Sequence, residues 1–401
     1  GNRQVINASV GKSDINADEN IAISQLATTS TSATAITIDS ANGAVTDAGD
    51  NEVDIVATGA SSAVVIHAVT GDAAGNALET SVVSIDIDNT TSGDIDISEA
   101  NAITITKAAN AGTNANDDVR IVTTGAGDIT VADVSAVGDG TAATITITTN
   151  DGAILDDGDN GTTNISAGAA NVTMNLTANG GANDDIGQNS GGGTPPLNYL
   201  DISGTNTPTI NPVVTAGQDI FINLLNTDIR SSDFAGAKAS ISSADIVGLH
   251  ASGGQFIFDD TTFNALTGSL LNIGANTNIN FTIAGPEISA ANDVTLTAVT
   301  GGISDNDATV DIVADDLIID AVTGVGNGNA LETTVATVDI DNATSGNIQI
   351  LETNDLTVTN ATQTTDNDLN DIIITTTSGN ITLGTLTTGG TAGDVILAAG
   401  G

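Results

Sequence analysis

Closely spaced aspartates recur between short apolar runs, and they are the side chains of this chain best suited to chemistry. Calcium takes about six to eight oxygen ligands, and neighbouring carboxylates together with backbone carbonyls can supply them. We therefore regard the most tightly grouped aspartates as candidate calcium ligands: Asp47, Asp50, Asp156, Asp157, Asp159, Asp184, Asp185, Asp305 and Asp307. The alternative for each group is that its side chains only cap turns, which is a common role of Asp and Asn.

Catalytic chemistry finds little support in the other polar residues. A polysaccharide lyase built on a β-helix needs a basic residue beside its acidic calcium site, whereas the basic residues here are scattered singly: Arg3, Lys12, Lys107, Arg120, Arg230 and Lys238. The two histidines, His67 and His250, are isolated as well. Paired carboxylates could hydrolyse glycosides, but Asp is so abundant that no pair stands out. We expect no enzymatic activity and no catalytic residues.

The charge and composition exclude several classes of partner. The chain has 6 Lys and Arg residues against 50 Asp and Glu, a formal net charge of −44. Such a surface repels phosphate backbones and anionic membranes, so we expect no nucleic-acid partner. Cysteine is absent, which rules out disulfides and thiolate metal sites. No apolar run is long enough to cross a bilayer, so we expect no membrane insertion.

The elements that position these aspartates belong to a long internal repeat. The stretch 68–99 returns at 321–352 without a gap, a shift of 253 positions (321 − 68). A shorter pattern, an apolar-x-apolar run followed by Gly and then Asp, occurs at 36–47, 145–156 and 294–305. Fixed-period similarity of this kind is typical of solenoid proteins.

Short runs with apolar side chains at every second position appear about every ten residues, which is the period of a strand. Thr, Val and Ile favour strands, and the Gly, Asn and Asp between them favour tight turns. An antiparallel sandwich would also alternate, but its strands are usually longer and its core richer in aromatics. We therefore predict an all-β, right-handed parallel β-helix (β-solenoid), with coils of about 20–22 residues and about 18–20 coils in all.

The middle of the chain differs in composition. All five prolines and all six phenylalanines lie between 195 and 286. We expect larger loops there, and one or two helical turns over 242–250, capped by Ser242 or Ser243. The phenylalanines are expected to fill wider coils; the alternative is that they form a binding face.

The repeats define four segments. Residues 1–35 form N-terminal coils or a junction, 36–144 a first β-helix repeat unit, 145–293 a second unit with insertions at about 190–290, and 294–401 a third. The third unit runs into the opening of a fourth copy, so we expect the natural chain to continue beyond Gly401.

The motif NALETxVxxxDIDNxTSGxIxI in both long copies, with SGNITLGTLTTGG and GDVILAAGG at 378–401, resembles the filamentous-haemagglutinin-type surface proteins of bacteria. The resemblance covers roughly 36–180 and 290–401. It implies a secreted right-handed β-helix of a fibre-forming or adhesive kind, on the cell surface or outside the cell.

These observations lead to an expected function. We expect an extracellular structural protein that forms a fibre or sheath by stacking head to tail on copies of itself, because the open ends of a solenoid are exposed sheet edges. The first alternative is a cell-surface adhesin that binds a host or polysaccharide ligand through the middle loops. A carbohydrate-active enzyme is a more distant alternative.

Overall fold

The computed structural model of the chain shows a β-solenoid of about 14 turns, with 55% of residues in strands and 3% in helices. It describes residues 5–8, 11–49, 52–71, 76–114, 117–138, 143–158, 161–168, 172–181, 184–188, 198–204, 209–215, 218–242, 244–268, 270–365, 370–389 and 393–400. Contacts divide the chain into two units, Gly1–Phe221 and Ile222–Gly401. The expected all-β parallel solenoid is confirmed.

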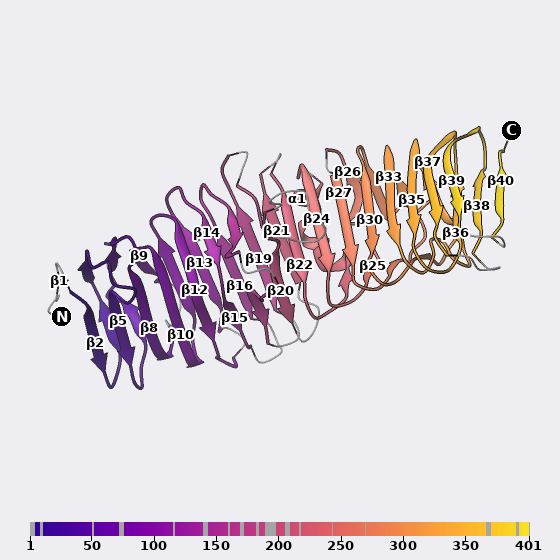
Figure 1. Ribbon diagram of the computed structural model, residues 1–401. Coiled ribbons are helices and arrows are strands. Elements are labelled where there is room, and N and C mark those ends of the chain that lie inside the picture. Colours follow the sequence, from indigo (N-terminus) through magenta and orange to yellow (C-terminus); the bar gives the residue numbers. More distant parts are fainter. Residues whose placement is uncertain are drawn as a thin grey trace. The chain divides into compact units, whose positions relative to one another are not determined.

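Unit 1 is built from parallel strands that stack coil upon coil (Figure 1). One sheet has the order β1 (Val5–Ala8), β4 (Gln25–Thr28), β7 (Ile55–Ala57), β9 (Leu78–Val82), β11 (Ile95–Glu99), β13 (Val119–Thr123), β16 (Thr144–Thr148), β19 (Thr173–Ala178) and β21 (Thr209–Val214). A second sheet contains β2 (Ser13–Ala17), β5 (Ile36–Ser40), β8 (Ala63–Thr70), β10 (Ser84–Ser92), β12 (Ile103–Asn110), β14 (Ile129–Val131), β15 (Val134–Ala136), β17 (Ile154–Asp156), β18 (Ile165–Ala167) and β20 (Leu200–Gly204). A short sheet pairs β3 (Ile21–Ile23) with β6 (Val45–Asp47). Strand β22 (Ile220–Leu224) contains the boundary with unit 2.

Unit 2 repeats this organisation with three sheets. The first contains β24 (Ile246–Ala251), β27 (Leu270–Ala275), β30 (Val294–Ala298), β33 (Asp316–Ala321), β35 (Thr337–Asn342), β37 (Leu356–Gln363) and β39 (Ile381–Thr388). The second has the order β23 (Ile229–Arg230), β25 (Phe256–Phe258), β28 (Ile279–Phe281) and β31 (Ile303–Asp305). The third has the order β26 (Phe263–Leu266), β29 (Ile288–Ala290), β32 (Ile312–Val313), β34 (Leu331–Thr334), β36 (Ile348–Glu352), β38 (Ile372–Thr376) and β40 (Val395–Ala398).

The strands form because alternate side chains stack on their equivalents in the next coil. Ile97 in β11 pairs with Leu78 of the coil before and Ile121 of the coil after, and all three are buried. Burying each such side chain contributes about 1.5–3 kcal/mol, repeated coil by coil. The core of each unit is therefore a set of aliphatic columns that run across its coils.

Coil length varies more than the sequence pattern predicted. The register advances 19 residues from Leu78 to Ile97 but 36 residues from Thr173 to Thr209. The expectation of about 18–20 coils of about 20–22 residues is therefore wrong: the solenoid has about 14 turns, and its strands stay in register across coils of unequal length. The repeat boundaries stay predictions, and strands β5, β16 and β30 begin at or beside residues 36, 145 and 294.

The helical turns expected over 242–250 are wrong. A 3₁₀ helix, Ser231–Ala237, and helix α1, Lys238–Ile241, lie just before that segment, and β24 occupies 246–251. Ile246 to Ala251 pair residue by residue with Leu270 to Ala275 of β27. Tertiary pairing of this apolar run outweighs the weak capping signal of the serines.

The two copies of the long repeat form the same corner with the same hydrogen bonds. The side-chain amide of Asn89 donates to the carbonyls of Ser92 and Gly93, at 2.8 and 2.7 Å. Asn342, at the shifted position, donates in the same way to Ser345 and Gly346, at 2.9 and 3.1 Å. Gly93 and Gly346 have φ of 83° and 79°, a left-handed backbone that favours glycine.

A buried glutamate joins successive coils in both copies. The Glu99 carboxylate accepts hydrogen bonds from the Thr80 hydroxyl at 2.7 Å and from the backbone N–H groups of Val82 and Asn101 at 3.1 and 3.0 Å. Glu352 repeats these contacts with Thr333, Val335 and Asn354. Burial raises the pKa of both carboxyls, and Glu99 and Glu352 are 0% exposed.

Replacing Glu99 with Ala leaves these donors without an acceptor inside the corner. We expect Glu99→Ala, and equally Glu352→Ala, to lower the free energy of unfolding by about 1–3 kcal/mol for each buried donor that loses its partner. Denaturant titration followed by circular dichroism measures the change. Ser98→Ala, at the half-buried outward position next to Glu99, is the control and should change it by less than about 0.5 kcal/mol. Equal losses in Glu99→Ala and Ser98→Ala would contradict the role given to the carboxylate.

Candidate functional site

Three acidic side chains of unit 1 converge at one corner, which we call cluster 1: Asp47, Asp54 and Glu79. Asp47 ends β6, Asp54 immediately precedes β7, and Glu79 lies in the next coil on β9. Because Ile55 pairs with Thr80 in register, Asp54 and Glu79 lie opposite each other, and strands pair about 4.8 Å apart. Each of the three offers a carboxylate oxygen within 4.8 Å of the other two.

Unit 2 contains a larger version, cluster 2: Glu287, Asp305, Asp307, Asp311 and Glu332. It comprises two groups of three carboxylates, and Asp311 belongs to both. Glu287, Asp311 and Glu332 precede or occupy the aligned strands β29, β32 and β34, so they form a column across three successive coils. The other two members lie at the corner after β31, where Asp305 is 6% exposed.

The two clusters occupy equivalent places in the repeat. In each, the carboxylate of the residue before the strand accepts a hydrogen bond from the backbone N–H of the glutamate in the next coil: Glu79 to Asp54 and Glu332 to Asp311, both at 3.1 Å. In each, an asparagine also donates to the aspartate that ends the preceding strand, Asn76 to Asp47 and Asn329 to Asp305. The same local arrangement is therefore present once in each unit.

Several oxygens of the clusters are buried and accept no hydrogen bond. They are Oδ1 of Asp47, Asp54 and Asp311, Oδ2 of Asp307, and Oε2 of Glu79, Glu287 and Glu332. Asp54, Asp311 and Glu287 are 0% exposed. In native structures a buried polar atom normally has a partner, so a repeated set of orphaned carboxylate oxygens needs an explanation.

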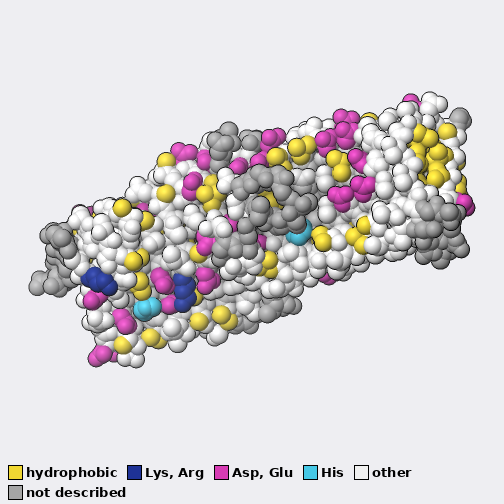
Figure 2. Space-filling view, viewed as in Figure 1, with side chains coloured by type: hydrophobic (Ala, Val, Ile, Leu, Met, Phe, Trp, Pro, Cys, Tyr) yellow, Lys and Arg dark blue, Asp and Glu magenta, His cyan; other side chains and the backbone are white. Residues whose placement is uncertain are grey.

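No cation of the described chain compensates these charges. The ion pairs among the described residues join Lys107 and His67 to Asp88, Arg120 to Asp96 and Arg230 to Asp259, all away from the clusters. Figure 2 shows how sparse Lys and Arg are on the face in view. The clusters are therefore concentrations of negative charge without a protein counter-charge.

Burial is the first cause of the pKa shifts in both clusters, and neighbouring carboxylates add to it. Burial raises the pKa of Asp54 to about 8 and that of Asp311 to about 9. It also raises the pKa of Glu332 to about 8 and that of Glu287 to about 7. A carboxyl with so high a pKa is held by the fold in an environment that disfavours its charged form.

Of the predicted calcium ligands, Asp47 joins cluster 1, and Asp305 and Asp307 join cluster 2. Asp156, Asp157, Asp184 and Asp185 join no group of three carboxylates among the residues with described positions. Asp50 and Asp159 lie outside the described residues.

Two of the aspartates outside the clusters, Asp156 and Asp184, act in turns. Asp156 accepts hydrogen bonds from the Gly158 N–H at 3.1 Å and from the Asn164 amide at 2.9 Å. Asp184 accepts one from Gly181, and Asp185 one from the Asp219 N–H at 2.8 Å. The contacts of Asp156 and Asp184 match the turn-capping alternative. The contact of Asp185 instead links two coils, because Asp219 lies 34 residues further along the chain.

Five members of the clusters are not among the ligands predicted from the sequence: Asp54, Glu79, Glu287, Asp311 and Glu332. Glu79 and Glu332 stand at the same place in the two copies of NALET, which is a signal that was available. Asp54 and Asp311 each stand directly before a short apolar strand, and only the coil register brings them next to the glutamate of the following coil.

The histidines take no part in the clusters. His250 is 7% exposed, and its Nδ1 lies 3.2 Å from Oδ1 of Asn223. Burial lowers its pKa to about 4, so it is neutral at ordinary pH. His67 is exposed and lies 3.4 Å from Asp88. Neither histidine has a described nucleophile or acidic cluster as its partner.

The phenylalanines are core residues, so the alternative of an aromatic binding face is wrong. All six are at most 1% exposed. Phe258 stacks on Phe281 with ring centroids 4.7 Å apart and planes 2° apart, and it also contacts Phe256 and Phe263. Phe256, Phe258, Phe263 and Phe281 lie in the core of unit 2 next to the 3₁₀ helix, whose Phe234 packs against Phe263.

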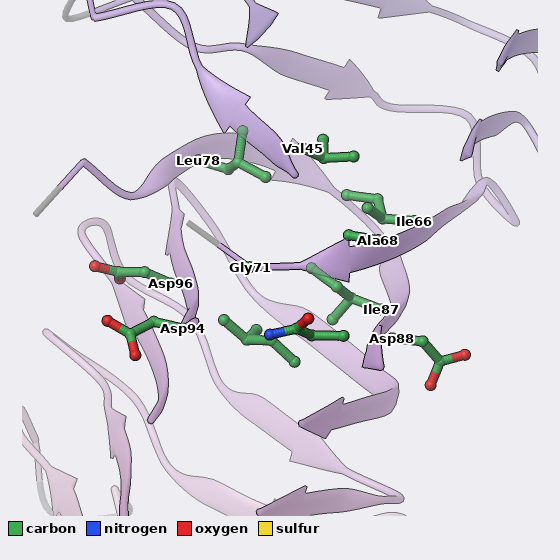
Figure 3. A pocket seen from close by; sticks show the side chains of 11 residues that line it. Val45, Ile66, Ala68, Gly71, Leu78, Ile87, Asp88, Asp94 and Asp96 are labelled. Atoms are coloured by element: carbon green, nitrogen blue, oxygen red, sulfur yellow. The ribbon is translucent and has the colours of Figure 1, made fainter. Parts of the chain in front are cut away.

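A small hollow lies inside unit 1 (Figure 3). The aliphatic side chains of Val45, Ile66, Leu78 and Ile87 line it, whereas Asp88 points away. Its cavity volume of about 10 Å³ is about what one water molecule requires. This hollow is too small for a substrate or an organic cofactor.

Comparison of the chain with protein-family models, curated proteins and solved structures finds no match. None of the helices in the described part of the chain is both long enough and apolar enough to cross a bilayer. The fold identifies the chain as a parallel β-solenoid. Its function must therefore be inferred from its own acidic clusters and surfaces.

The raised pKa values predict that stability in a chelating buffer falls as pH rises. Folding keeps a proton on carboxyls that release it in the unfolded chain, so the unfolded state binds fewer protons between the two pKa values. The melting temperature should therefore decrease from about pH 4 to about pH 9. Asp311→Asn should flatten that decrease, and the exposed Asp14→Asn should leave it unchanged. Thermal melts across this range test it, and a parallel decrease in all three proteins would contradict it.

Proposed function

We propose that this protein is a structural, extracellular β-solenoid that forms a fibre or sheath by stacking end to end on copies of itself, and that it is not an enzyme. The resemblance to filamentous-haemagglutinin-type surface proteins supports a secreted, non-catalytic role. The high negative charge is consistent with this role, because it opposes side-by-side clumping of neighbouring molecules.

The observation that carries this proposal is the in-register stacking of like coils, which β40 continues by pairing with β38. Strand β40 pairs with β38 on one side, and its residues Val395, Ile396 and Leu397 are 45%, 48% and 38% exposed. Leu383 of β39 is 45% exposed as well. Figure 2 shows apolar side chains gathered at this end of unit 2.

The chemistry of that edge fits another coil of the same kind. Leu397 lies over Ile374 of β38 in register, so it continues an aliphatic column. An exposed strand edge offers unpaired N–H and C=O groups in the spacing that a parallel strand requires. Another coil of the same kind supplies both the matching column and the matching backbone pattern. Where that coil belongs to a second copy of the chain, the head-to-tail contact propagates as a filament.

Electron microscopy and sedimentation velocity of the purified 401-residue chain test this proposal. We expect uniform filaments that lengthen with protein concentration. Leu397→Lys places a charge in the inward aliphatic column at β40. Because inward-pointing charges block pairing at a strand edge, this variant should form no filaments. Val299→Lys is the matched control, because Val299 is 45% exposed but lies away from β39 and β40. Monomers at all concentrations, or filaments unaffected by Leu397→Lys, would overturn the proposal.

Adhesion to a host or polysaccharide ligand, the first alternative from the sequence, stays a prediction. The phenylalanines of the middle section cannot provide an adhesive surface, because they are buried. No other feature of the described loops favours a particular ligand.

A further inference from the structure

The two acidic clusters share a property that turn capping does not explain. In each, one oxygen of the central aspartate accepts a backbone hydrogen bond, while the other is buried and has no partner. The central residues, Asp54 and Asp311, are 0% exposed. A carboxylate buried without compensation costs several kcal/mol, so the fold needs a proton or a cation at these points.

The donor set favours a hard cation. The grouped ligand atoms are carboxylate oxygens, with no histidine or cysteine among them. Carboxylate sites suit calcium, magnesium and manganese, whereas zinc and copper favour nitrogen and sulfur ligands. Magnesium demands near-ideal octahedral geometry and retains its waters, while calcium accepts several carboxylates in irregular arrangements. Carboxylates gathered from different coils at irregular corners fit calcium best.

We propose that the chain binds calcium at cluster 1, through Asp47, Asp54 and Glu79, and at cluster 2, through carboxylates centred on Asp311. Each cluster holds at least one calcium ion. Cluster 2 contains two groups of three carboxylates, and Asp311 belongs to both groups. This inference does not depend on the proposed assembly into fibres.

Each ion adds a link between coils that strand pairing, aliphatic packing and a few side-chain hydrogen bonds already hold together. In cluster 1 the ligands come from two successive coils, because Asp54 immediately precedes β7 and Glu79 lies on β9, the strand that pairs with β7. In cluster 2 Glu287, Asp311 and Glu332 come from three successive coils. A cation at these points replaces repulsion between stacked carboxylates by attraction, so calcium stabilises the stack locally in each unit.

Isothermal titration calorimetry of the full chain with calcium at neutral pH, after removal of divalent ions, tests the proposal. We expect saturable binding of at least two ions per chain in the range of extracellular modules, with dissociation constants of about 0.1–1 mM. Asp54→Asn should remove the site in unit 1, and Asp311→Asn should remove all binding in unit 2. The double variant should bind none. The exposed Asp14→Asn and Asp320→Asn change the charge equally and should keep full stoichiometry.

Thermal melts give a second readout that a merely structural role would not produce. With chelator, Asp54→Asn and Asp311→Asn should melt at the same temperature as the natural sequence or higher, because each replaces a buried carboxyl that has no counter-charge with a neutral amide of the same size. With calcium, the natural sequence should melt higher than it does with chelator, and the double variant should show no such rise. Clusters that hold only shared protons would show no saturable calcium binding and no rise in the natural sequence. That result, or binding retained by the double variant, would overturn the inference.

Discussion

Parallel in-register stacking is the constraint on which the rest of each unit depends. Every inward side chain lies about 4.8 Å from its equivalent in the next coil, so side chains at equivalent positions must be compatible with close contact. Ile and Val satisfy this by packing, and the Ile97 column is an example. Polar residues can enter the interior only with partners that recur, as Glu99 and Asn89 show. In clusters 1 and 2 acidic residues of successive coils stack without such partners, so several carboxyl groups are buried close together.

The same constraint explains which parts of the fold were predictable. Alternation in short runs such as Ile95–Ile97 determines both the strand and its inward face, so the all-β parallel solenoid followed from the sequence. The number of coils did not follow, because corner length leaves no periodic signal: 19 residues separate Leu78 from Ile97, and 36 separate Thr173 from Thr209. The helical segment was misplaced because serine caps are a local signal, whereas β24 forms through pairing with β27.

The candidate site was predictable only in part for a related reason. Proximity in sequence pointed to Asp47, Asp305 and Asp307, but it pointed equally to Asp156 and Asp184, which cap turns. Register, not spacing, brings Asp54 next to Glu79 and Asp311 next to Glu332, and register across coils of unequal length cannot be read from one sequence. The repeat offered an indirect clue, since the NALET glutamate occurs at the same place twice.

The unequal corners have a further consequence for how such a chain can change. Because the ladder registers hold whether a coil spans 19 or 36 residues, insertions and deletions at corners leave the aliphatic columns intact. Lengthening a surface loop adds only a slowly growing entropy of closure. The core of each unit and its outward decoration can therefore diverge independently, and the longest corners are natural places to graft foreign peptides onto a rigid display scaffold.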